Sequence, residues 1–472
     1  MNGAKRLKQT EFGALERRAL AEQSSSGKDS GQALVSQKDH GMPNDRARKA
    51  SLLPRVKPEK RWMITQRVDD VDPTRANAQA REDLAQGATG LSLVFEGAPN
   101  AFGYGLPATP EALARALEGV ALDSTHLRID AHPMSRASVD WLVALLTARK
   151  VDPDKLSLSF GIDPAAVFAG TGRLRMSVEA LLASMPQSLA HFFGLGVPGV
   201  LLEADGRPFH NAGATEAQEL GIMLAGAVSH LRMFEEARQP LIYATPHIGF
   251  ALCVDQDQLV SMAKIRAMRK LWQRAQEACS IVSTPGQIHA ETSWRMMTRL
   301  DPETNILRTT AACFAAAAGG ADSITILPHS IAHGLPDGFA RRVARNTQLI
   351  MGGESHVDFV VDPAAGPGVE ALTDDLCELA WTEFQAIEAD GGLLRSLASD
   401  RLQARIREAR EVRADAYCEG DLSIVGTTLY PLKSERPIST LDAERRPPMQ
   451  DGVAFCQALD PLRIDETIKG RA

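Results

Sequence analysis

The sequence of 472 residues has few cysteines, and none of them are paired along the chain. It contains no Cys-x-x-Cys and no local group of cysteine and histidine. A disulfide framework or a structural zinc site needs such pairs, so we predict reduced thiols, no metal ion and a cytoplasmic protein. The six cysteines are Cys253, Cys279, Cys313, Cys377, Cys418 and Cys456.

Other signals are also missing from the sequence. No apolar run is long enough to cross a membrane, and no secretory signal peptide is visible. The formal net charge of -7 argues against a nucleic-acid partner, which would need a basic surface. The sequence has no phosphate-binding loop, no GxGxxG and no HExxH. We therefore predict a protein that binds neither a membrane nor nucleic acid.

From about residue 61 the chain alternates short apolar runs with amphipathic runs of helical spacing. Repeated strand–helix units of this kind favour a parallel sheet, and eight of them predict an α/β protein with a (β/α)8 TIM barrel. The predicted strands are Thr89–Glu96, Thr125–Ala131, Lys155–Asp163, Val197–Ala204, Pro240–Pro246, Gln287–Ser293, Asp322–His329 and Val357–Pro363.

The helix ends carry recognisable signals. Thr215 stands three residues before Gln218, the spacing of a capping box, and Gly319-Gly320 follows an alanine-rich run as a helix stop. The predicted helices include Pro110–Gly119, Val139–Arg149, Ser177–Phe192, Thr215–Arg238, Met262–Cys279 and Asn305–Ala318.

Three segments differ in composition. Residues 1–60 are rich in basic and small polar residues, which predicts either a flexible extension or an arm that docks on a partner chain. Residues 61–365 hold the predicted barrel. Residues 366–472 form a helical C-terminal segment, with runs at Glu370–Asp390 and Leu393–Arg413, and a proline-rich tail.

Functional side chains of a (β/α)8 barrel lie at the carboxyl ends of its strands. Histidines and carboxylates at that end could perform acid–base chemistry or hold a metal ion, although their spacing matches no metal motif. The candidates at the predicted strand ends are Glu203, Asp205, His247, Glu291, Thr292, Ser293, His329 and Asp362. Of these, Glu291, Thr292, Ser293 and His329, together with Arg295, are the predicted substrate-binding residues.

The stretch His289–Pro363 contains the segments ETSWRMMTRLDPETNILRTT, GGADS, GLPDGFARRVARNTQLI and ESHVDFVVDP, and EADGGL follows. In this order the segments resemble the methylmalonyl-CoA mutase family, and more narrowly the small (beta) subunits of its two-chain enzymes. The resemblance runs from about Arg61 to about Leu394. It implies a TIM barrel and an isomerase complex that interconverts (R)-methylmalonyl-CoA and succinyl-CoA by radical rearrangement.

The resemblance also shows where this chain departs from catalytic subunits. Those subunits carry Ser-Gly-Tyr-His just before an Ala-Gly-Ala, and an ungapped match places Arg207 at the Tyr and Pro208 at the His. Proline has no polar side chain and cannot donate a hydrogen bond. His210, two residues further on, could take over only if the loop shifted.

Two further positions agree with this loss. Where catalytic subunits have Arg-Gln-Tyr, this chain has Thr65-Gln66-Arg67, so Arg67 replaces a second tyrosine. Where they have Ser-Leu-His-Thr-Asn, the His becomes Thr325 and the Asn becomes Leu327. We therefore expect Arg67, Arg207, Pro208, Thr325 and Leu327 to mark a vestigial site.

The family's cofactor, adenosylcobalamin, is held by a separate domain with an Asp-x-His-x-x-Gly motif. The nearest string here, Asp130-Ala131-His132, lacks the glycine and lies on a predicted barrel strand. We thus expect no cobalamin-binding domain, and a large catalytic partner subunit that carries the cofactor. The alternatives are the substrate-binding subunit of a related acyl-CoA mutase, and a non-enzymatic acyl-CoA-binding protein.

A predicted helix after Leu335-Pro336 carries three arginines, Arg341, Arg342 and Arg345. We expect them to lie on a solvated or subunit-facing side of that helix; the alternative is that they contact CoA phosphates.

Overall fold

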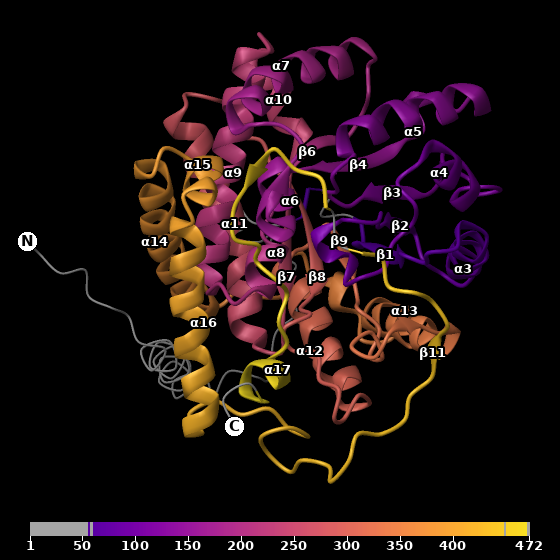
Figure 1. Ribbon diagram of the computed structural model, residues 1–472, viewed down its shortest axis with the longest axis vertical. Coiled ribbons are helices and arrows are strands. Elements are labelled where there is room, and N and C mark those ends of the chain that lie inside the picture. The colour runs from indigo at the N-terminus through magenta and orange to yellow at the C-terminus, as the bar shows by residue number, and fades with distance from the viewer. Residues whose placement is uncertain (1–54, 57–59, 448–449, 470–472) are drawn as a thin grey trace, which may run out of the picture.

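The computed structural model describes residues 55–56, 60–447 and 450–469, and its centre is a closed barrel of parallel strands (Figure 1). The chain order of the strands is also their order round the barrel, and β1 closes against β9 through the pairs Met63↔Ser323 and Thr65↔Thr325. The predicted (β/α)8 barrel is therefore confirmed. The barrel strands are β1 (Met63–Val68), β2 (Gly90–Leu93), β3 (His126–Ile129), β4 (Ser157–Ile162), β6 (Val200–Asp205), β7 (Ile248–Val254), β8 (Gln287–Thr292) and β9 (Ser323–Thr325).

Helices surround the barrel and cover the outer face of its strands (Figure 1). Both faces of most strands are buried, as a parallel sheet requires, and all seven residues of β7 are. The surrounding helices are α3 (Pro73–Ala85), α4 (Pro110–Ala116), α5 (Ser135–Arg149), α6 (Pro164–Thr171), α7 (Val178–Gly194), α9 (Glu216–Glu236), α11 (Gln258–Ala278), α12 (Thr304–Gly319) and α13 (Gly338–Gly353).

The predicted helix ends are confirmed in two places. Thr215 and Gln218 form the reciprocal capping box at the start of α9. Gly320 closes α12 in the left-handed region with φ near +90°, which a glycine adopts without steric cost.

Two of the eight predicted strands are wrong. Pro240–Pro246 folds as the helical turn α10 (Leu241–Ala244) and part of η3 (Thr245–His247), because Pro240 starts the turn and the strand begins only at Ile248. Val357–Pro363 contains the single 3-10 turn η4 (Val357–Phe359), because the barrel is already closed and offers no strand to pair with.

The sequence analysis missed two barrel strands, β7 (Ile248–Val254), which begins just after the wrongly predicted Pro240–Pro246, and β1, with sequence MITQRV. Strand β1 was not recognised because it contains polar side chains, whereas a buried parallel strand is normally a continuous apolar run. Each of them has a partner inside the fold: Thr65 bonds to Thr325, Gln66 to the carbonyl of Arg341, and Arg67 to carboxylates.

The C-terminal segment adds a second layer on one side of the barrel. Helix α14 (Pro367–Ala389) packs on α9 and α11, and α15 (Leu393–Ala398) and α16 (Arg401–Glu419) follow (Figure 1). The predicted single run Leu393–Arg413 is thus broken, at Asp400, which has φ near +54°. Most of the predicted N-terminal extension, residues 1–54 and 57–59, lies outside the described residues.

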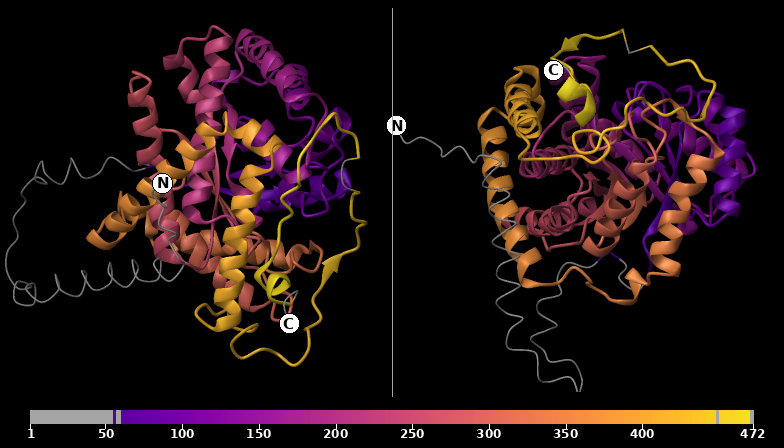
Figure 2. Two further views of the ribbon diagram at one scale, coloured as in Figure 1. Left: turned by 60° about the vertical axis from the view of Figure 1, so that its left-hand side comes forward. Right: turned by 90° about the horizontal axis from the view of Figure 1, so that it is seen from below.

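The last part of the chain, residues 440–447 and 450–469, is here named the C-terminal strap. Its β11 (Thr440–Leu441) pairs with β10 (Leu335–Pro336), and its β12 (Ala454–Phe455) pairs with β5 (Arg173–Leu174). It then bonds to Ala169, Asn211 and Arg295, which follow β4, β6 and β8, and ends in α17 (Ile464–Lys469). The strap therefore runs round the barrel at the carboxyl ends of the strands (Figure 2).

Candidate functional site

Three arginines and five carboxylates occupy the barrel at the carboxyl ends of its strands. Arg67 pairs with Asp69 and Glu291, through Nε–Oδ2 and Nη1–Oε2 distances of 2.9 and 3.0 Å. All eight side chains come from residues that are buried. We call this set the barrel network: Arg67, Arg128, Arg207, Asp69, Asp130, Glu203, Asp205 and Glu291.

Arg207 is the centre of the barrel network. It lies in α8 (Arg207–Asn211), directly after β6, and has no exposed surface. Its Nε and Nη2 bond the two oxygens of Asp205 at 2.9 and 2.8 Å, and Nη2 also lies 3.1 Å from Asp130 Oδ1. The paired bonds are the fork geometry in which guanidinium and carboxylate interact most strongly.

Arg128 completes the barrel network from β3. Its Nε lies 3.0 Å from Asp130 Oδ1, and its two terminal nitrogens contact both oxygens of Glu203. Asp130 therefore bridges Arg128 and Arg207. The barrel network is one connected set of ion pairs rather than separate contacts.

The electrostatics favour the charged form of most of these groups. Burial alone would lower the pKa of Arg207, but Asp130, Asp205 and Glu291 outweigh it and raise that pKa well above its usual value. Burial opposes ionisation of Asp130 too, yet Arg207 and Arg128 hold the pKa of Asp130 below its ordinary value. Burial raises the pKa of Glu291.

The barrel network decides what the barrel can hold. Each guanidinium of the barrel network is bonded to carboxylates, although Arg207 Nη1 and Glu291 Oε1 have no hydrogen-bond partner among the described residues. A ligand at this position would have to break an ion pair and leave a buried charge without its partner. The arrangement is a stable polar core, and it lies where a catalytic barrel would expose reactive side chains.

The other three predicted vestigial residues also have structural roles. Pro208 is the second residue of α8 and is buried. Thr325 Oγ1 lies 2.6 Å from Thr65 Oγ1, across the closure of the barrel. Leu327 is buried, and its backbone N–H donates to Thr292 Oγ1 at 2.8 Å. Pro208 and Leu327 have no polar side chain, and the hydroxyl of Thr325 is already hydrogen-bonded.

His210 belongs to a separate polar cluster beside the barrel network. His210 lies in the helical turn α8, and its side chain points to α9. Its Nδ1 donates to Glu219 Oε2 at 3.0 Å, and its Nε2 accepts from Ser293 Oγ at 2.9 Å. Burial, with Arg295 next, lowers the pKa of His210 to about 4, so the ring is neutral at pH 7.

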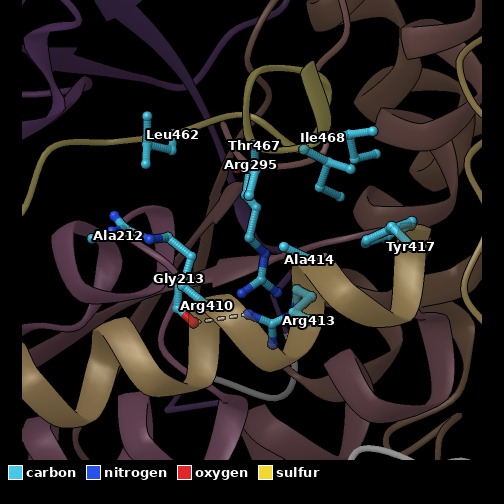
Figure 3. A pocket seen from close by; sticks show the side chains of 11 residues that line it. Ala212, Gly213, Arg295, Arg410, Arg413, Ala414, Tyr417, Leu462, Thr467 and Ile468 are labelled. Atoms are coloured by element: carbon cyan, nitrogen blue, oxygen red, sulfur yellow. Dashed lines mark hydrogen bonds between the residues drawn. The ribbon is translucent and has the colours of Figure 1, made fainter. Parts of the chain in front are cut away.

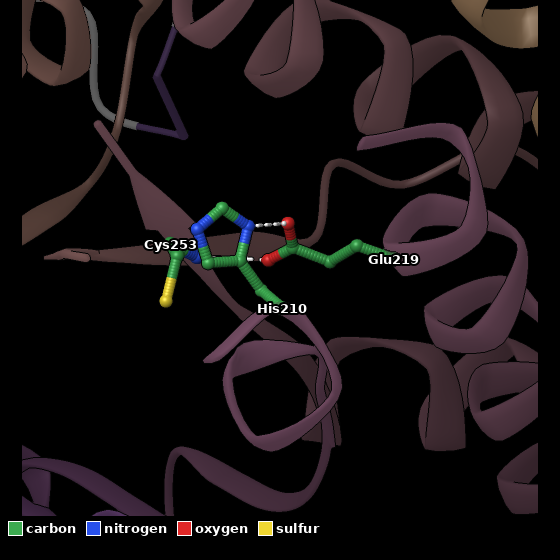
Figure 4. A group of neighbouring side chains, drawn as sticks. All are labelled: His210, Glu219 and Cys253. Carbon is green, nitrogen blue, oxygen red and sulfur yellow. Dashed lines mark hydrogen bonds and ion pairs between the residues drawn. The ribbon is translucent and has the colours of Figure 1, made fainter. Parts of the chain in front are cut away.

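His210, Glu219 and Cys253 place three possible metal ligands within 4.8 Å of one another (Figure 4). Lys264 Nζ lies 2.7 Å from Glu219 Oε2, and the backbone N–H of Cys253 donates to Glu219 Oε1 at 2.8 Å. Both carboxylate oxygens are thus already bonded, one of them to an ammonium group. Burial also raises the pKa of the Cys253 thiol well above its usual value. The group is a hydrogen-bonded core cluster and not a metal centre.

The predicted substrate-binding residues are divided between these clusters. Glu291 joins the barrel network, Thr292 bonds the Leu327 backbone and Ser293 bonds His210. Arg295 pairs with Glu216 at 2.8 Å and with Asp255 at 3.0 Å. His329 packs edge-on against Phe339, with ring centroids 6.1 Å apart.

Two predicted positions at the barrel mouth are wrong. His247 precedes β7 and lies at the amino end of that strand, with Nδ1 2.6 Å from the carbonyl of Gly199. Asp362 follows no strand, since Val357–Pro363 is not one, and it pairs with Arg266 of α11. Neither side chain is part of the barrel network.

The arginines of α13 are held inside the protein. Arg341 and Arg345 both pair with Asp83 of α3, the latter at 2.6 Å, whereas Arg342 is exposed. The predicted solvated face is thus wrong for Arg341 and Arg345, because Asp83 draws them into the contact between the two helices.

A small pocket lies beneath the C-terminal strap (Figure 3). Arg413 of α16 donates to the carbonyl of Gly213 at 2.9 Å, and Leu462 and Ile468 of the strap face it. Gly213 has φ near +117°, and a Cβ there would meet the side chain of Arg410. The close approach of α16 to this turn therefore requires glycine.

The sequence analysis missed Arg128, Asp69 and the structural role of Asp130, although a signal was present. Charged residues occur at alternating positions at the ends of three strands: Arg67 with Asp69, Arg128 with Asp130, and Glu203 with Asp205. Alternate residues of a strand point to the same face. In a barrel with helices outside, a charged pair on one face predicts an inward ion-pair network.

The model of the family described as methylmalonyl-CoA mutase matches residues 37–458. The chain is 38% identical over 390 residues to the methylmalonyl-CoA mutase small subunit of Streptomyces virginiae, covering 82% of this chain and 61% of that protein. A probable methylmalonyl-CoA mutase small subunit of Mycobacterium tuberculosis is 40% identical over 336 residues, which cover 68% of this chain and 52% of the relative. That of Propionibacterium freudenreichii subsp. shermanii is 30% identical over 383 residues, covering 80% and 58%. The chain thus spans about half to three fifths of these relatives.

Proposed function

Because the chain belongs to the methylmalonyl-CoA mutase family, we propose that it is the small, non-catalytic subunit of a two-chain mutase. The partner would be a large catalytic subunit that carries adenosylcobalamin. Together they would interconvert (R)-methylmalonyl-CoA and succinyl-CoA by radical rearrangement. This chain would stabilise the partner through a shared interface.

The barrel network is the observation that carries this proposal. Both positions that match the family's catalytic tyrosines are arginines, Arg67 and Arg207, and both are buried in ion pairs with carboxylates. The position of the catalytic histidine is Pro208, which cannot donate a hydrogen bond. The two alternatives, a substrate-binding subunit and a free acyl-CoA-binding protein, both need an acyl site where this core is filled.

The described residues do not fit cobalamin. The string closest to the family's cobalt-ligating motif is Asp130-Ala131-His132, which lies at the end of β3. Asp130 is bonded to Arg128 and Arg207, and His132 is 1% exposed with its ring against Phe95. Asp130 is committed to two arginines, and His132 lines a cavity of about 100 Å³, which is too small for a corrin ring, so we assign the cofactor to the partner.

Exposed apolar side chains support a partner subunit. Phe359, Val360 and Val361 follow one another along the chain and are 75, 57 and 59% exposed. Apolar side chains gathered in this way mark surfaces that another protein covers.

We expect assembly with the partner to stabilise the chain strongly. Alone, the chain should self-associate or be poorly soluble. Co-expression with a full-length mutase chain should give one species in size-exclusion chromatography. At a thousandfold excess of partner over Kd, mass action adds about 4 kcal/mol of stability, which differential scanning calorimetry would record as a higher Tm. A soluble monomer whose Tm does not respond to the partner would contradict the proposal.

The cofactor assignment has its own test. The chain purified alone should show no stoichiometric corrin absorbance after incubation with adenosylcobalamin, whereas the complex should. Stoichiometric corrin on the isolated chain would overturn the assignment of the cofactor to the partner.

Substitution of His210 tests whether this residue has a structural or a catalytic role. We expect His210→Ala to destabilise the chain by about 1–3 kcal/mol, because Glu219 and Ser293 lose a buried partner. Turnover of the reconstituted heterodimer, normalised to the amount of complex, should stay nearly unchanged. The comparable change at the partner's catalytic histidine should cost roughly a hundredfold or more. If His210→Ala abolished turnover while the complex still assembled, this chain would be catalytic.

A further inference from the structure

A cavity of about 100 Å³ lies outside the barrel network, at the carboxyl ends of β3 and β4. Its walls come from the loop before α5, the start of α6 and the segment before α7. The polar side chains among its lining residues are those of His132, Ser135, Arg136, Asp163, Arg173 and Arg175.

The three arginines of this cavity form no ion pair among the residues that the structure describes. Arg136 Nη1 bonds Ser184 Oγ at 3.0 Å, Arg175 Nη1 lies 3.0 Å from the sulfur of Met134, and Arg173 donates to the carbonyl of Gln450. The arginines of the barrel network all have carboxylate partners. Burial lowers the pKa of Arg136, and no carboxylate offsets it. An anion in the cavity would supply the missing countercharge.

His132 adds a neutral donor to the same wall. Its Nδ1 accepts from the backbone N–H of Met134 at 3.3 Å, so the ring proton lies on Nε2. Nε2 is buried and has no hydrogen-bond partner in the described chain. A buried donor without a partner costs free energy unless a ligand or water accepts its proton.

The one carboxylate in the wall is already bonded. Asp163 Oδ1 accepts from the backbone N–H groups of Ala165 and Ala166, and Oδ2 accepts from that of Asp205 at 2.9 Å. Its oxygens are therefore committed to the backbone. Helix α5 begins at Ser135 and has no side-chain cap. Because Ser135 and Arg136 line the cavity, the positive end of the helix dipole also borders it.

We propose that this cavity binds the phosphate group of a small phosphorylated molecule. Three guanidiniums from two segments can contact several oxygens of one phosphate, while a carboxylate offers only two. The His132 Nε2–H and the first turn of α5 would complete the donor set. The site is separate from the barrel network and goes beyond the proposed function, since it requires no mutase chemistry.

Isothermal titration calorimetry tests the site with three probes: ADP, inorganic phosphate and succinate. The protein is the full chain, in the assembly in which it purifies, in a phosphate-free buffer. We expect saturable ADP binding, weaker phosphate binding and no measurable succinate binding. The double variant Arg136→Gln/Arg175→Gln should weaken ADP binding about tenfold or more.

A matched control removes the same charge elsewhere. The variant Arg81→Gln/Arg342→Gln changes two exposed arginines on α3 and α13 and should leave ADP affinity unchanged. His132→Phe removes the Nε2 donor and should weaken ADP binding several-fold. Absence of saturable ADP binding, succinate affinity equal to that of phosphate, or ADP binding that both double variants weaken alike would overturn the proposal.

Discussion

Replacing Arg207 with methionine is expected to lower the free energy of unfolding by about 3–5 kcal/mol, although no active-site function is lost. The side chain has no exposed surface, and it is bonded to Asp205 and Asp130. Methionine has a similar length but no charge. The substitution therefore leaves buried carboxylates without their countercharge, which costs more than the net value of the ion pair itself.

Urea denaturation followed by circular dichroism measures this change. Arg342→Met on the exposed face of α13 is the matched control and should change stability by less than about 0.5 kcal/mol. Adding Asp205→Asn to Arg207→Met should recover part of the loss, since it removes one of the orphaned charges. A cost below about 1 kcal/mol for Arg207→Met would mean that the barrel is open enough for water to solvate those carboxylates.

The turnover of the assembled enzyme provides the complementary measurement. With Arg207→Ala, kcat per amount of intact complex should be nearly unchanged, even though less complex survives. The stability and kcat of the Arg207 variants together distinguish loss of folded protein from loss of catalysis, which an activity measurement alone cannot do.

The sequence identified the barrel because six of the eight predicted strands coincide with strands of the barrel. The strand predictions failed where contacts between residues distant in the chain determine the local structure. Strand β1 is polar because its partners lie on β8, β9 and α13, which are more than 200 residues away in the chain. Phe359, Val360 and Val361 form a β-like run, but the closed barrel leaves them no neighbouring strand.

The site was predicted as a set of residues but not as a set of pairs. The end of β6 was identified through Glu203 and Asp205, and Asp205 pairs with Arg207. The partner of Glu203 is instead Arg128, 75 residues away. Pairing depends on strand register and on which side chains share a level of the barrel, and a linear sequence contains neither.

Stability should fall steeply in mild acid, because several histidines are buried in neutral form. Burial lowers the pKa of His126 and His210 to about 4, and that of His132 and His230 to about 3. In the unfolded chain these rings titrate near 6.5. Below that pH the unfolded state binds protons that the folded state does not bind. The free energy of unfolding therefore decreases as the pH falls from 6.5 toward 4.

The size of the effect follows from the proton difference. Between pH 7.5 and 5.5 each of the four histidines costs about 1.4 kcal/mol, or about 5 kcal/mol together. Asp163 acts in the opposite sense, because burial raises its pKa to about 7 and the folded state then gains a proton, worth about 2 kcal/mol. The expected net loss from these five groups is about 3–4 kcal/mol, a large part of the stability of an ordinary domain.

Urea titrations at pH 7.5, 6.5 and 5.5 measure this loss directly, and His230 identifies its source. His230 lies in α9 and is buried, and its Nδ1 has no hydrogen-bond partner in the described part of the chain. His230→Gln removes one titrating ring, so the loss between pH 7.5 and 5.5 should shrink by about 1.4 kcal/mol. His191→Gln on α7 changes a half-exposed ring and should leave the loss as in the unaltered chain. If the two variants behaved alike, the buried ring of His230 would not be a source of the acid sensitivity.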